Sequence, residues 1–385
     1  MTSKKAWGIY VHIPYCIQKC GYCDFVSAPI CGAAEEMASY AAALRAEILR
    51  EAPPLRARWG NAATVYIGGG TPTALSAALL TGIIETLTSA AGMPAECTVE
   101  ANPGTVDEIY LAQLKAAGVS RISLGVQSFD DGLLRVIGRI HTAAEAERAF
   151  HAARRAGFTN ISLDLMYGLP QQTLEDLKGS VTAAIALSPE HISVYGLTVE
   201  EGTPFAVAAE KGCLPLPQAE DEEAMYEHIV HTLPACGYRR YEISNFARPG
   251  FESRHNLSYW KNVPYLGVGA AAHSYLDGMR WANESDTAAY IRALSAGAPV
   301  RTPEDAARTE ANAMEEYAFL ALRTAEGIDE QDFFRTFGVP VDVPYGTVIA
   351  DLIAQGFLSR LDGRIHLTER GMKFGNEIFY SFLFS

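Results

Sequence analysis

The chain has 385 residues and a formal net charge of −14, and 49% of its residues are hydrophobic. A chain of this length can form two or three domains with a buried core, and its composition is that of a globular protein. The acidic balance argues against a nucleic-acid partner, because proteins that bind duplexes usually present a basic face.

The first residues carry no signal peptide that we can recognise. Residues 1–5 are polar, and the apolar run after them is interrupted by His12, Pro14 and Cys16. No uncharged stretch is long enough to span a bilayer. We therefore expect a cytoplasmic protein that is at most peripheral to a membrane.

Short apolar runs rich in β-branched residues predict strands at 8–13, 64–67, 97–100, 121–126, 161–166 and 192–197. Helical patterns lie between them at 39–50, 106–117, 143–156 and 174–186, the last after Thr173 as a cap. Buried strands that alternate with helices predict a parallel sheet with helices outside it. The expected fold class is α/β, an open or partial (β/α)6 barrel similar to a TIM barrel.

Chemistry in such a fold lies in the loops that follow the carboxyl ends of the strands. Polar or glycine-rich residues follow each predicted strand of this chain, which indicates a single site on one face. These residues are Cys16, Cys20 and Cys23; 68–72; Glu100 and Asn102; Gln127 and Ser128; Asp164 with 167–170; and Thr198 and Glu200.

The pattern changes after residue 205, so we assign 1–205 to the barrel, 206–300 to a middle segment that completes it, and 301–385 to a C-terminal domain. An acidic helix start and a loop-rich stretch over 238–274 mark the middle segment. In the last domain, helical patterns at 310–322, 329–337 and 345–355 precede 357–367, which has the hairpin signal Asp362-Gly363 at its centre. This order predicts an α+β domain similar to a winged helix.

Three of the seven cysteines fall within eight residues in the pattern C-x3-C-x2-C, at Cys16, Cys20 and Cys23. Thiolates are soft ligands that suit iron–sulfur clusters or zinc. Three cysteines without a close fourth would leave one iron of a [4Fe–4S] cluster open to another ligand, whereas zinc sites usually show a second pair downstream. We expect Cys97, Cys213 and Cys236 to be small buried hydrophobes, and Cys31 stays open.

The chain resembles the radical S-adenosylmethionine family in three features. These are the aromatic Tyr22 before the third cysteine, the run 10–15 before the first, and the GGGTP segment at 68–72. The resemblance implies that the cysteines hold a [4Fe–4S] cluster and that the open iron binds S-adenosylmethionine. It also implies that Glu100 or Asp164 accepts hydrogen bonds from ribose hydroxyls, and that Arg139, in the helical-looking stretch 133–140, pairs with the methionine carboxylate. Besides Tyr22 of the cysteine motif, resemblance to the oxygen-independent coproporphyrinogen oxidase branch of the family implies cofactor contacts at Tyr10, Gly69, Gly70, Thr71, Glu100, Gln127, Arg139, Asp164 and Gly196.

Two branches of that family resemble the whole chain, the oxygen-independent coproporphyrinogen III oxidases and the HemW-like haem chaperones. The oxidase pattern has a further cysteine where Phe25 stands here, and it has an extension before the cluster, whereas the first ligand here is already residue 16. The segment 255–260 matches the H-N-x-x-Y-W motif that is associated with haem in the chaperone branch.

The motif resemblance implies that His255, Asn256, Tyr259 and Trp260 contact haem. A histidine nitrogen can ligate the iron axially, and aromatic rings can cover the macrocycle. The alternative is that His255 and Asn256 secure a loop by hydrogen bonds while Trp260 belongs to the core.

We therefore expect a haem chaperone that delivers haem to client proteins, the haem-requiring membrane enzymes. Coproporphyrinogen oxidation is the alternative function, and whether the protein is an enzyme stays open. The expected partners are haem and haem-accepting proteins, and a homodimer is left open.

Overall fold

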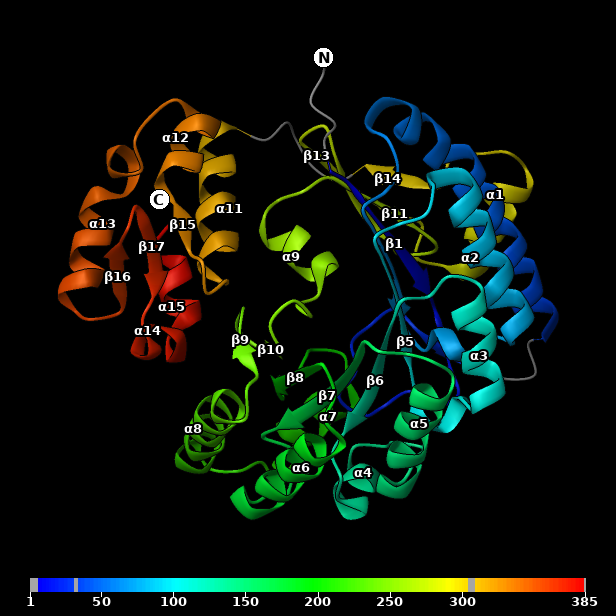
Figure 1. Ribbon diagram of the computed structural model, residues 1–385, viewed down its shortest axis with the longest axis horizontal. Coiled ribbons are helices and arrows are strands. Elements are labelled where there is room, and N and C mark those ends of the chain that lie inside the picture. The colour runs from blue at the N-terminus through cyan, green and yellow to red at the C-terminus, as the bar shows by residue number, and fades with distance from the viewer. Residues whose placement is uncertain (1–5, 31–33, 304–308, 384–385) are drawn as a thin grey trace.

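The computed structural model describes residues 6–30, 34–303 and 309–383, so Cys31 lies outside the described residues. Within these residues, twelve strands form one open sheet in the order β14-β13-β12-β11-β1-β4-β5-β6-β7-β8-β10-β9 (Figure 1). Its centre consists of the predicted parallel strands, β1 (Gly8–Ile13), β4 (Thr64–Gly69), β5 (Glu96–Ala101), β6 (Arg121–Gln127), β7 (Ile161–Tyr167) and β8 (His191–Gly196). The sheet does not close, so the α/β fold is a partial barrel.

Helices cover the outer side of the parallel strands (Figure 1). They are α1 (Ala34–Trp59), α2 (Ala77–Ala91), α3 (Glu108–Ala116), α4 (Asp131–Val136), α5 (Ala143–Arg155) and α6 (Leu174–Leu187). The predicted helical segments correspond to α1, α3, α5 and α6, and Thr173 caps α6 by accepting a hydrogen bond from the Asp176 amide. Helix α2 was not predicted; Glu85 is its only charged residue, and Thr81, Thr88 and Ser89 supply the rest of its polar side.

The alternation of side chains along the strands separates an apolar face from a polar one. Ile9, Val65 and Val99 point toward the outer helices and belong to the main hydrophobic core. The residues one position away, such as Tyr66 and Glu100, line the inside of the barrel instead. Burial of the outer face thus fixes the register that turns polar side chains inward.

The middle segment extends both edges of the sheet. Residues 238–274, which were expected to be mostly loop, contain β9 (Arg239–Arg240), β10 (Asn245–Ala247), α9 (Arg254–Trp260) and β11 (Tyr265–Val268), and β12 begins at its end. Strand β11 is parallel to β1, and β10 is antiparallel to β8. The sheet also includes residues 301–303, beyond the expected boundary at 300, because β14 pairs with β13.

Shorter elements complete this part of the chain. Around the cluster loop and the strand ends they are β2 (Tyr15–Cys16), β3 (Ala28–Pro29), η1 (Pro72–Ala74) and η2 (Pro103–Thr105). Farther along they are α7 (Pro204–Glu210), α8 (Ala219–Ala235), β12 (His273–Leu276), β13 (Met279–Asn283), α10 (Thr287–Ser295) and β14 (Arg301–Pro303).

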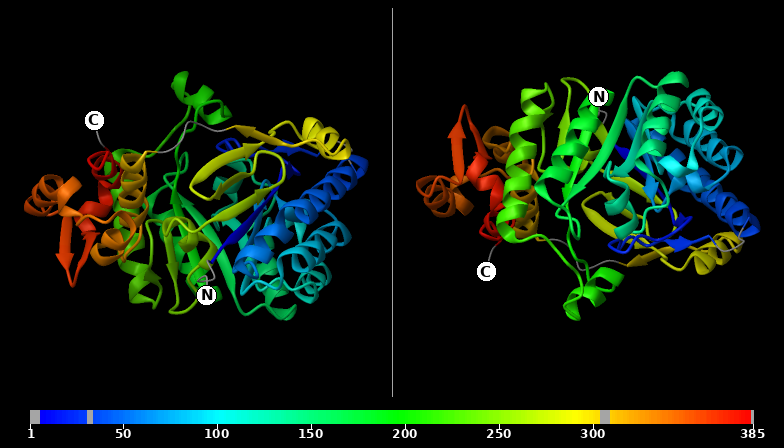
Figure 2. Two further views of the ribbon diagram at one scale, coloured as in Figure 1. Left: turned by 90° about the horizontal axis from the view of Figure 1, so that it is seen from above. Right: turned by 90° about the horizontal axis from the view of Figure 1, so that it is seen from below.

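The C-terminal domain has the predicted winged-helix-like order of helices followed by a hairpin. It contains α11 (Glu310–Leu322), β15 (Ile328–Asp329), α12 (Glu330–Phe337), α13 (Asp342–Ala354), β16 (Leu358–Leu361), β17 (Arg364–Leu367), α14 (Glu369–Lys373) and α15 (Gly375–Tyr380). It has its own hydrophobic core and lies at one end of the molecule (Figure 2). Asp362 and Gly363 both have positive φ, as a tight hairpin turn requires.

Two of the expected cysteine environments are wrong. Cys97 is buried as expected, but Cys213 and Cys236 are exposed. Both lie at helix ends, where the chain turns at the surface. Among the described helices, none is long and apolar enough to cross a membrane.

Candidate cofactor site

The loops at the carboxyl ends of the parallel strands enclose a cavity of about 480 Å³. Most of the residues that the sequence assigns to the cofactor line it: Cys16, Cys20, Tyr22, Cys23, Gly69, Gly70, Thr71, Glu100, Gln127, Arg139, Asp164, Gly196 and Asn256. The predicted residues that do not line it are Tyr10, His255, Tyr259 and Trp260. Most of the residues that follow the strands thus lie on one face of the barrel, but Gly68, Pro72, Ser128 and residues 167–170 do not line the cavity.

The cluster loop brings the three thiols to one wall of this cavity. Burial raises the pKa of the Cys23 thiol, and Cys20 and Cys16 are near enough to raise it further. The Thr71 hydroxyl donates to Cys16 Sγ at 3.6 Å, and Arg139 Nη1 donates to Cys20 Sγ at 3.7 Å. Donors aimed at sulfur stabilise thiolates, which are the ligand form of cysteine.

This arrangement fits a four-iron cluster better than a single metal ion. Among the described residues, no three His, Cys, Asp or Glu side chains are placed to hold one metal ion. In a [4Fe–4S] cluster each cysteine binds a different iron, so the three sulfurs need not converge on one point. Cys16, Cys20 and Cys23, which line the cavity, would supply ligands for three irons of such a cluster.

The glycine-rich turn after β4 passes close to the cluster loop. A Cβ on Gly70 would lie 3.1 Å from Cys16 Sγ and 2.7 Å from the Tyr15 carbonyl oxygen, so this turn tolerates no side chain there. Gly69 has φ of 107°, a backbone conformation that favours glycine. The turn therefore brings bare backbone to the place where the cluster and its ligand would meet.

His12 connects this turn with the cluster loop. Its Nε2 lies 2.8 Å from the Val26 carbonyl oxygen, and its Nδ1 lies 2.9 Å from the Tyr10 hydroxyl. Because a carbonyl can only accept, Nε2 carries the proton and Nδ1 accepts from Tyr10. Through His12, Tyr10 is thus linked to Val26 of the cluster loop, although neither Tyr10 nor His12 lines the cavity.

Two partly buried carboxyl groups face the inside of the barrel. Glu100 accepts a hydrogen bond of 2.6 Å from the Tyr66 hydroxyl, and burial raises the pKa of Glu100 to about 7. Asp164 accepts hydrogen bonds from Ser123 and Ser162, and burial raises its pKa as well. Glu100 also accepts from the Gly69 amide, and Asp164 from the Ser193 hydroxyl. Glu100 therefore keeps more acceptor positions for ligand hydroxyls than Asp164 does.

Arg139 lies after α4 and not within a helix, contrary to the expectation for 133–140, because α4 ends at Val136 and Gly138 turns with φ of 80°. Its Nη2 donates to the Gly125 carbonyl, while its Nε is buried without a partner. Gln127 is also irregular, since φ is 68° at the bulge that ends β6. These departures from regular structure turn both side chains toward the cavity.

The motif at 255–260 forms α9, which lies between the sheet and the C-terminal domain (Figure 1). His255 is 0% exposed, and both of its ring nitrogens are engaged, with the Thr64 hydroxyl at 2.9 Å and the Tyr259 hydroxyl at 2.8 Å. Its ring stacks on Tyr66 with 5.2 Å between centroids, and burial lowers its pKa to about 3. In this structure His255 therefore has no free nitrogen for haem iron, and the hydrogen-bonding alternative describes its surroundings.

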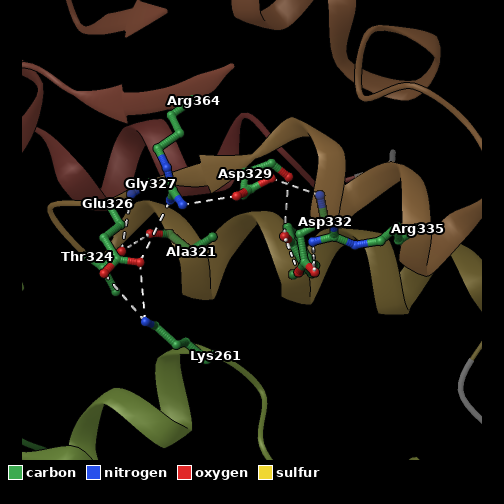
Figure 3. Close-up of polar contacts among 10 residues, drawn as sticks. Lys261, Ala321, Thr324, Glu326, Gly327, Asp329, Asp332, Arg335 and Arg364 are labelled. Atoms are coloured by element: carbon green, nitrogen blue, oxygen red, sulfur yellow. Dashed lines mark hydrogen bonds and ion pairs between the residues drawn. The ribbon is translucent and has the colours of Figure 1, made fainter. Parts of the chain in front are cut away.

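The other residues of the motif have different surroundings. Asn256 lines the cavity, whereas Trp260 faces the C-terminal domain, where the guanidinium of Arg323 lies 5.0 Å from its ring. Beside it, Lys261 forms an ion pair of 3.2 Å with Glu326 (Figure 3). Helix α9 thus connects the cavity floor with the C-terminal domain.

Several side chains of the cavity were not predicted, among them Tyr66, Arg121, Ser123, Ser193 and Tyr195. All lie within strands and not after them. For three of them the signal was available, because Tyr66, Arg121 and Ser123 lie an even number of positions before a predicted residue of the same strand or turn, as Ser123 does before Gln127. Ser193 and Tyr195 had no such signal.

Comparison with known proteins agrees with this geometry. The Radical SAM superfamily profile matches residues 10–184, and the profile of the HemN C-terminal domain matches residues 309–374. The solved structure of the coproporphyrinogen III oxidase HemN of Escherichia coli matches 98% of this chain and 90% of its own chain, with a TM-score of 0.84. The two sequences are 22% identical, so this similarity concerns the fold alone. Fold and site together define a radical SAM protein with a HemN-type C-terminal domain.

Curated relatives identify the family within this class. The heme chaperone HemW of Bacillus subtilis is 40% identical over 97% of this chain and 98% of its own length. The heme chaperone HemW of Escherichia coli is 36% identical over the full length of both chains. The chain belongs to the HemW family.

Proposed function

We propose that this protein binds haem and delivers it to haem-requiring proteins. The observation that carries the proposal is the 36% to 40% identity, over nearly the whole chain, with relatives named heme chaperones. Identity with the oxidase HemN is 22%. Phe25, in place of the further cysteine of the oxidase pattern, supports the same choice.

The cysteines Cys16, Cys20 and Cys23 would hold a [4Fe–4S] cluster, and S-adenosylmethionine would occupy the cavity beside it. When bound, these groups supply one-electron reduction of a sulfonium, the chemistry that the superfamily shares. The chain would orient the cofactor. The turn at Gly69 and Gly70 would let the cofactor approach the backbone closely, and Glu100 and Asp164 would accept hydrogen bonds from its hydroxyls. The remaining proposed contacts are Tyr10, Tyr22, Thr71, Gln127, Arg139 and Gly196.

The haem residues proposed from the motif, His255, Asn256, Tyr259 and Trp260, need a further condition. Since both nitrogens of His255 are bonded inside the protein, axial ligation by this residue requires that α9 separates from the sheet. Haem binding elsewhere on the chain requires no such movement, so the two arrangements differ in their dependence on His255.

Haem titration of the full-length protein under anaerobic conditions tests the proposal. We expect a saturable shift of the Soret band. His255→Ala should abolish that shift if α9 opens to ligate the iron, and should leave it if haem binds elsewhere. The absence of a saturable shift in the wild type would contradict haem binding, and conversion of coproporphyrinogen III to protoporphyrinogen by the reduced protein would favour the oxidase alternative.

The role of the cluster is tested with a matched pair of cysteine variants. Cys23→Ser should lose the iron and sulfide, about four of each per chain, whereas Cys213→Ser should retain them because Cys213 is exposed and outside the cavity. Titrating both variants with haem shows whether haem binding needs the cluster. Equal iron content in the two variants would contradict the ligand assignment.

A further inference from the structure

Tyr241 lies where three parts of the molecule meet. It stands between β9 and β10 and is 8% exposed. Its hydroxyl accepts a hydrogen bond of 3.2 Å from the amide of Ser253, the residue that caps α9, and lies 2.8 Å from His191 Nε2 on β8. Its carbonyl accepts a hydrogen bond of 3.0 Å from the Ala325 amide of the C-terminal domain. One residue thus contacts the barrel, the start of α9 and the C-terminal domain.

The contacts of His191 continue from Tyr241 to the cofactor cavity. His191 Nδ1 lies 2.8 Å from the hydroxyl of Ser162, its partner in register on β7. That hydroxyl donates to Oδ1 of Asp164, which lines the cavity, at 3.2 Å. Ser162 and His191 are 0% and 1% exposed, so no bulk water competes for these bonds. Four hydrogen bonds therefore run from the start of α9 to a carboxyl group of the cavity.

The donors in this chain of hydrogen bonds all point toward Asp164. The Ser162 hydroxyl donates its hydrogen to the carboxyl oxygen, so it can only accept from His191 Nδ1. His191 is neutral because burial lowers its pKa well below the ordinary value, and its Nε2 therefore accepts from the Tyr241 hydroxyl. The Tyr241 oxygen in turn accepts from the Ser253 amide. Hydrogen bonds aligned in this way polarise and strengthen one another.

Asp164 is the point at which a ligand can act on this chain. Three serine hydroxyls donate to it, those of Ser123, Ser162 and Ser193. A carboxylate has about four acceptor positions, so a ligand hydroxyl that donates to Asp164 competes with these serines. Weakening the bond from Ser162 also weakens the bonds behind it, the last of which holds the start of α9.

We propose that this chain of hydrogen bonds couples the cofactor cavity to α9, so that a ligand bound to Asp164 loosens the helix from the sheet. The coupling rests on the proposed binding of S-adenosylmethionine, and it deepens the proposed function, in which ligation by His255 requires that α9 separates from the sheet. His191 and Tyr241 are then positioning residues, since neither lines the cavity. Asn256 does line it and offers a direct route from the cavity to α9, which the test must distinguish.

The first measurement is hydrogen exchange, followed by mass spectrometry, in the full-length, cluster-loaded protein with and without S-adenosylmethionine. In the wild type the ligand should speed exchange in α9 about fivefold, the effect of one hydrogen bond. Tyr241→Phe removes one hydroxyl and should abolish this response, as should Ser162→Ala, which breaks the chain at its other end and replaces the first variant if that does not fold. Tyr238→Phe is the matched control and should respond as the wild type does, because the buried Tyr238 hydroxyl donates to the Pro189 carbonyl outside the chain.

The second measurement is calorimetric titration of the same proteins with S-adenosylmethionine. Coupling is reciprocal, so a ligand that loosens α9 must bind more tightly once α9 is disconnected from Asp164. Tyr241→Phe should therefore bind S-adenosylmethionine about fivefold more tightly than the wild type. Loss of a purely structural contact would leave the affinity unchanged or lower it.

The outcomes separate this coupling from the proposed function. An α9 that does not respond in the wild type, or that responds equally in Tyr241→Phe, would overturn the coupling alone, and the second result would assign the response to Asn256. Unchanged or weaker binding by Tyr241→Phe would overturn it as well. A wild-type protein that binds no S-adenosylmethionine would contradict the cofactor assignment and the coupling together. Neither measurement uses haem, so a failure of the haem titration is distinguished from both.

Discussion

Gly69 and Gly157 share a left-handed backbone but differ in what surrounds them. Gly69 has φ of 107°, and a Cβ there would lie 2.5 Å from the His12 ring; Gly157 has φ of 90° and nothing within 4 Å. A left-handed alanine costs about 1–2 kcal/mol, and the overlap with His12 adds about 1–3 kcal/mol. Because His12 holds the cluster loop through Val26, the overlap should also disturb the site.

We therefore predict that Gly69→Ala lowers the free energy of unfolding more than Gly157→Ala does, by about 1–3 kcal/mol, and that it alone reduces cluster incorporation. Urea denaturation measures the first difference, and iron content after reconstitution measures the second. Equal stability and equal iron content in the two variants would show that the close approach of Gly69 to His12 has no consequence.

At the scale of the element, α9 is held to the sheet by a buried neutral histidine. Its His255 ring bonds Thr64 on β4 and Tyr259 one turn later, and burial lowers the pKa of His255 from the ordinary 6.5 to about 3. The unfolded chain therefore takes up a proton near pH 6.5, while the folded chain does so near pH 3. Stability is fully present above pH 6.5 and is lost as the pH falls toward 3, by at most about 1.4 kcal/mol per pH unit.

We predict that His255→Gln weakens this acid dependence. At pH 7.5 the variant should be less stable by about 1–3 kcal/mol, since it leaves buried hydroxyls with poorer partners, and the difference from the wild type should shrink between pH 6.5 and 4. Denaturation at a series of pH values checks this. His151→Gln, in an exposed position of α5, should follow the wild type, and parallel curves for His255→Gln and the wild type would contradict the prediction.

The elements differ in how much of them the sequence could predict. The central strands were predicted to within two residues at each end, because they are buried on the outer face and their sequences are apolar runs. Helix α9 was not predicted, because its polar motif packs on the amino ends of strands that are far away in the sequence. Only the fold brings His255 beside Thr64. Arg121 was missed for a similar reason, since only the fold brings it into one cavity with Glu100 and Asp164 of other strands.

At the scale of the whole molecule, the barrel and the C-terminal domain meet along a largely polar boundary. Lys261 pairs with Glu326, and Lys373 pairs with Glu223 and Glu227 on α8. Such exposed pairs contribute little to stability, because water and salt screen their charges. A stronger contact is expected where Arg323, after α11, lies over the ring of Trp260 at 5.0 Å.

Arg323 differs from the surface pairs because it is partly shielded from water and surrounded by aromatic rings. Phe319 and Phe379 of its own domain lie 5.2 Å and 5.3 Å from it, so Trp260 supplies the ring from the barrel side. Cation–π contacts of desolvated groups contribute up to about 2 kcal/mol. Trp260 should therefore do more than Lys261 to keep the C-terminal domain against α9.

We predict that Trp260→Ala increases hydrogen exchange in α9 and α11 while the parallel strands keep their protection, because the contact lies at the boundary and not in either core. Lys261→Ala, one residue away, is the matched control. It should change the free energy of opening, as measured by exchange, by no more than about 1 kcal/mol. Mass spectrometry of exchange in the full-length protein resolves both helices. Equal exchange in the two variants would mean that the ring does not hold the domains together; faster exchange throughout the barrel would assign Trp260 to its core.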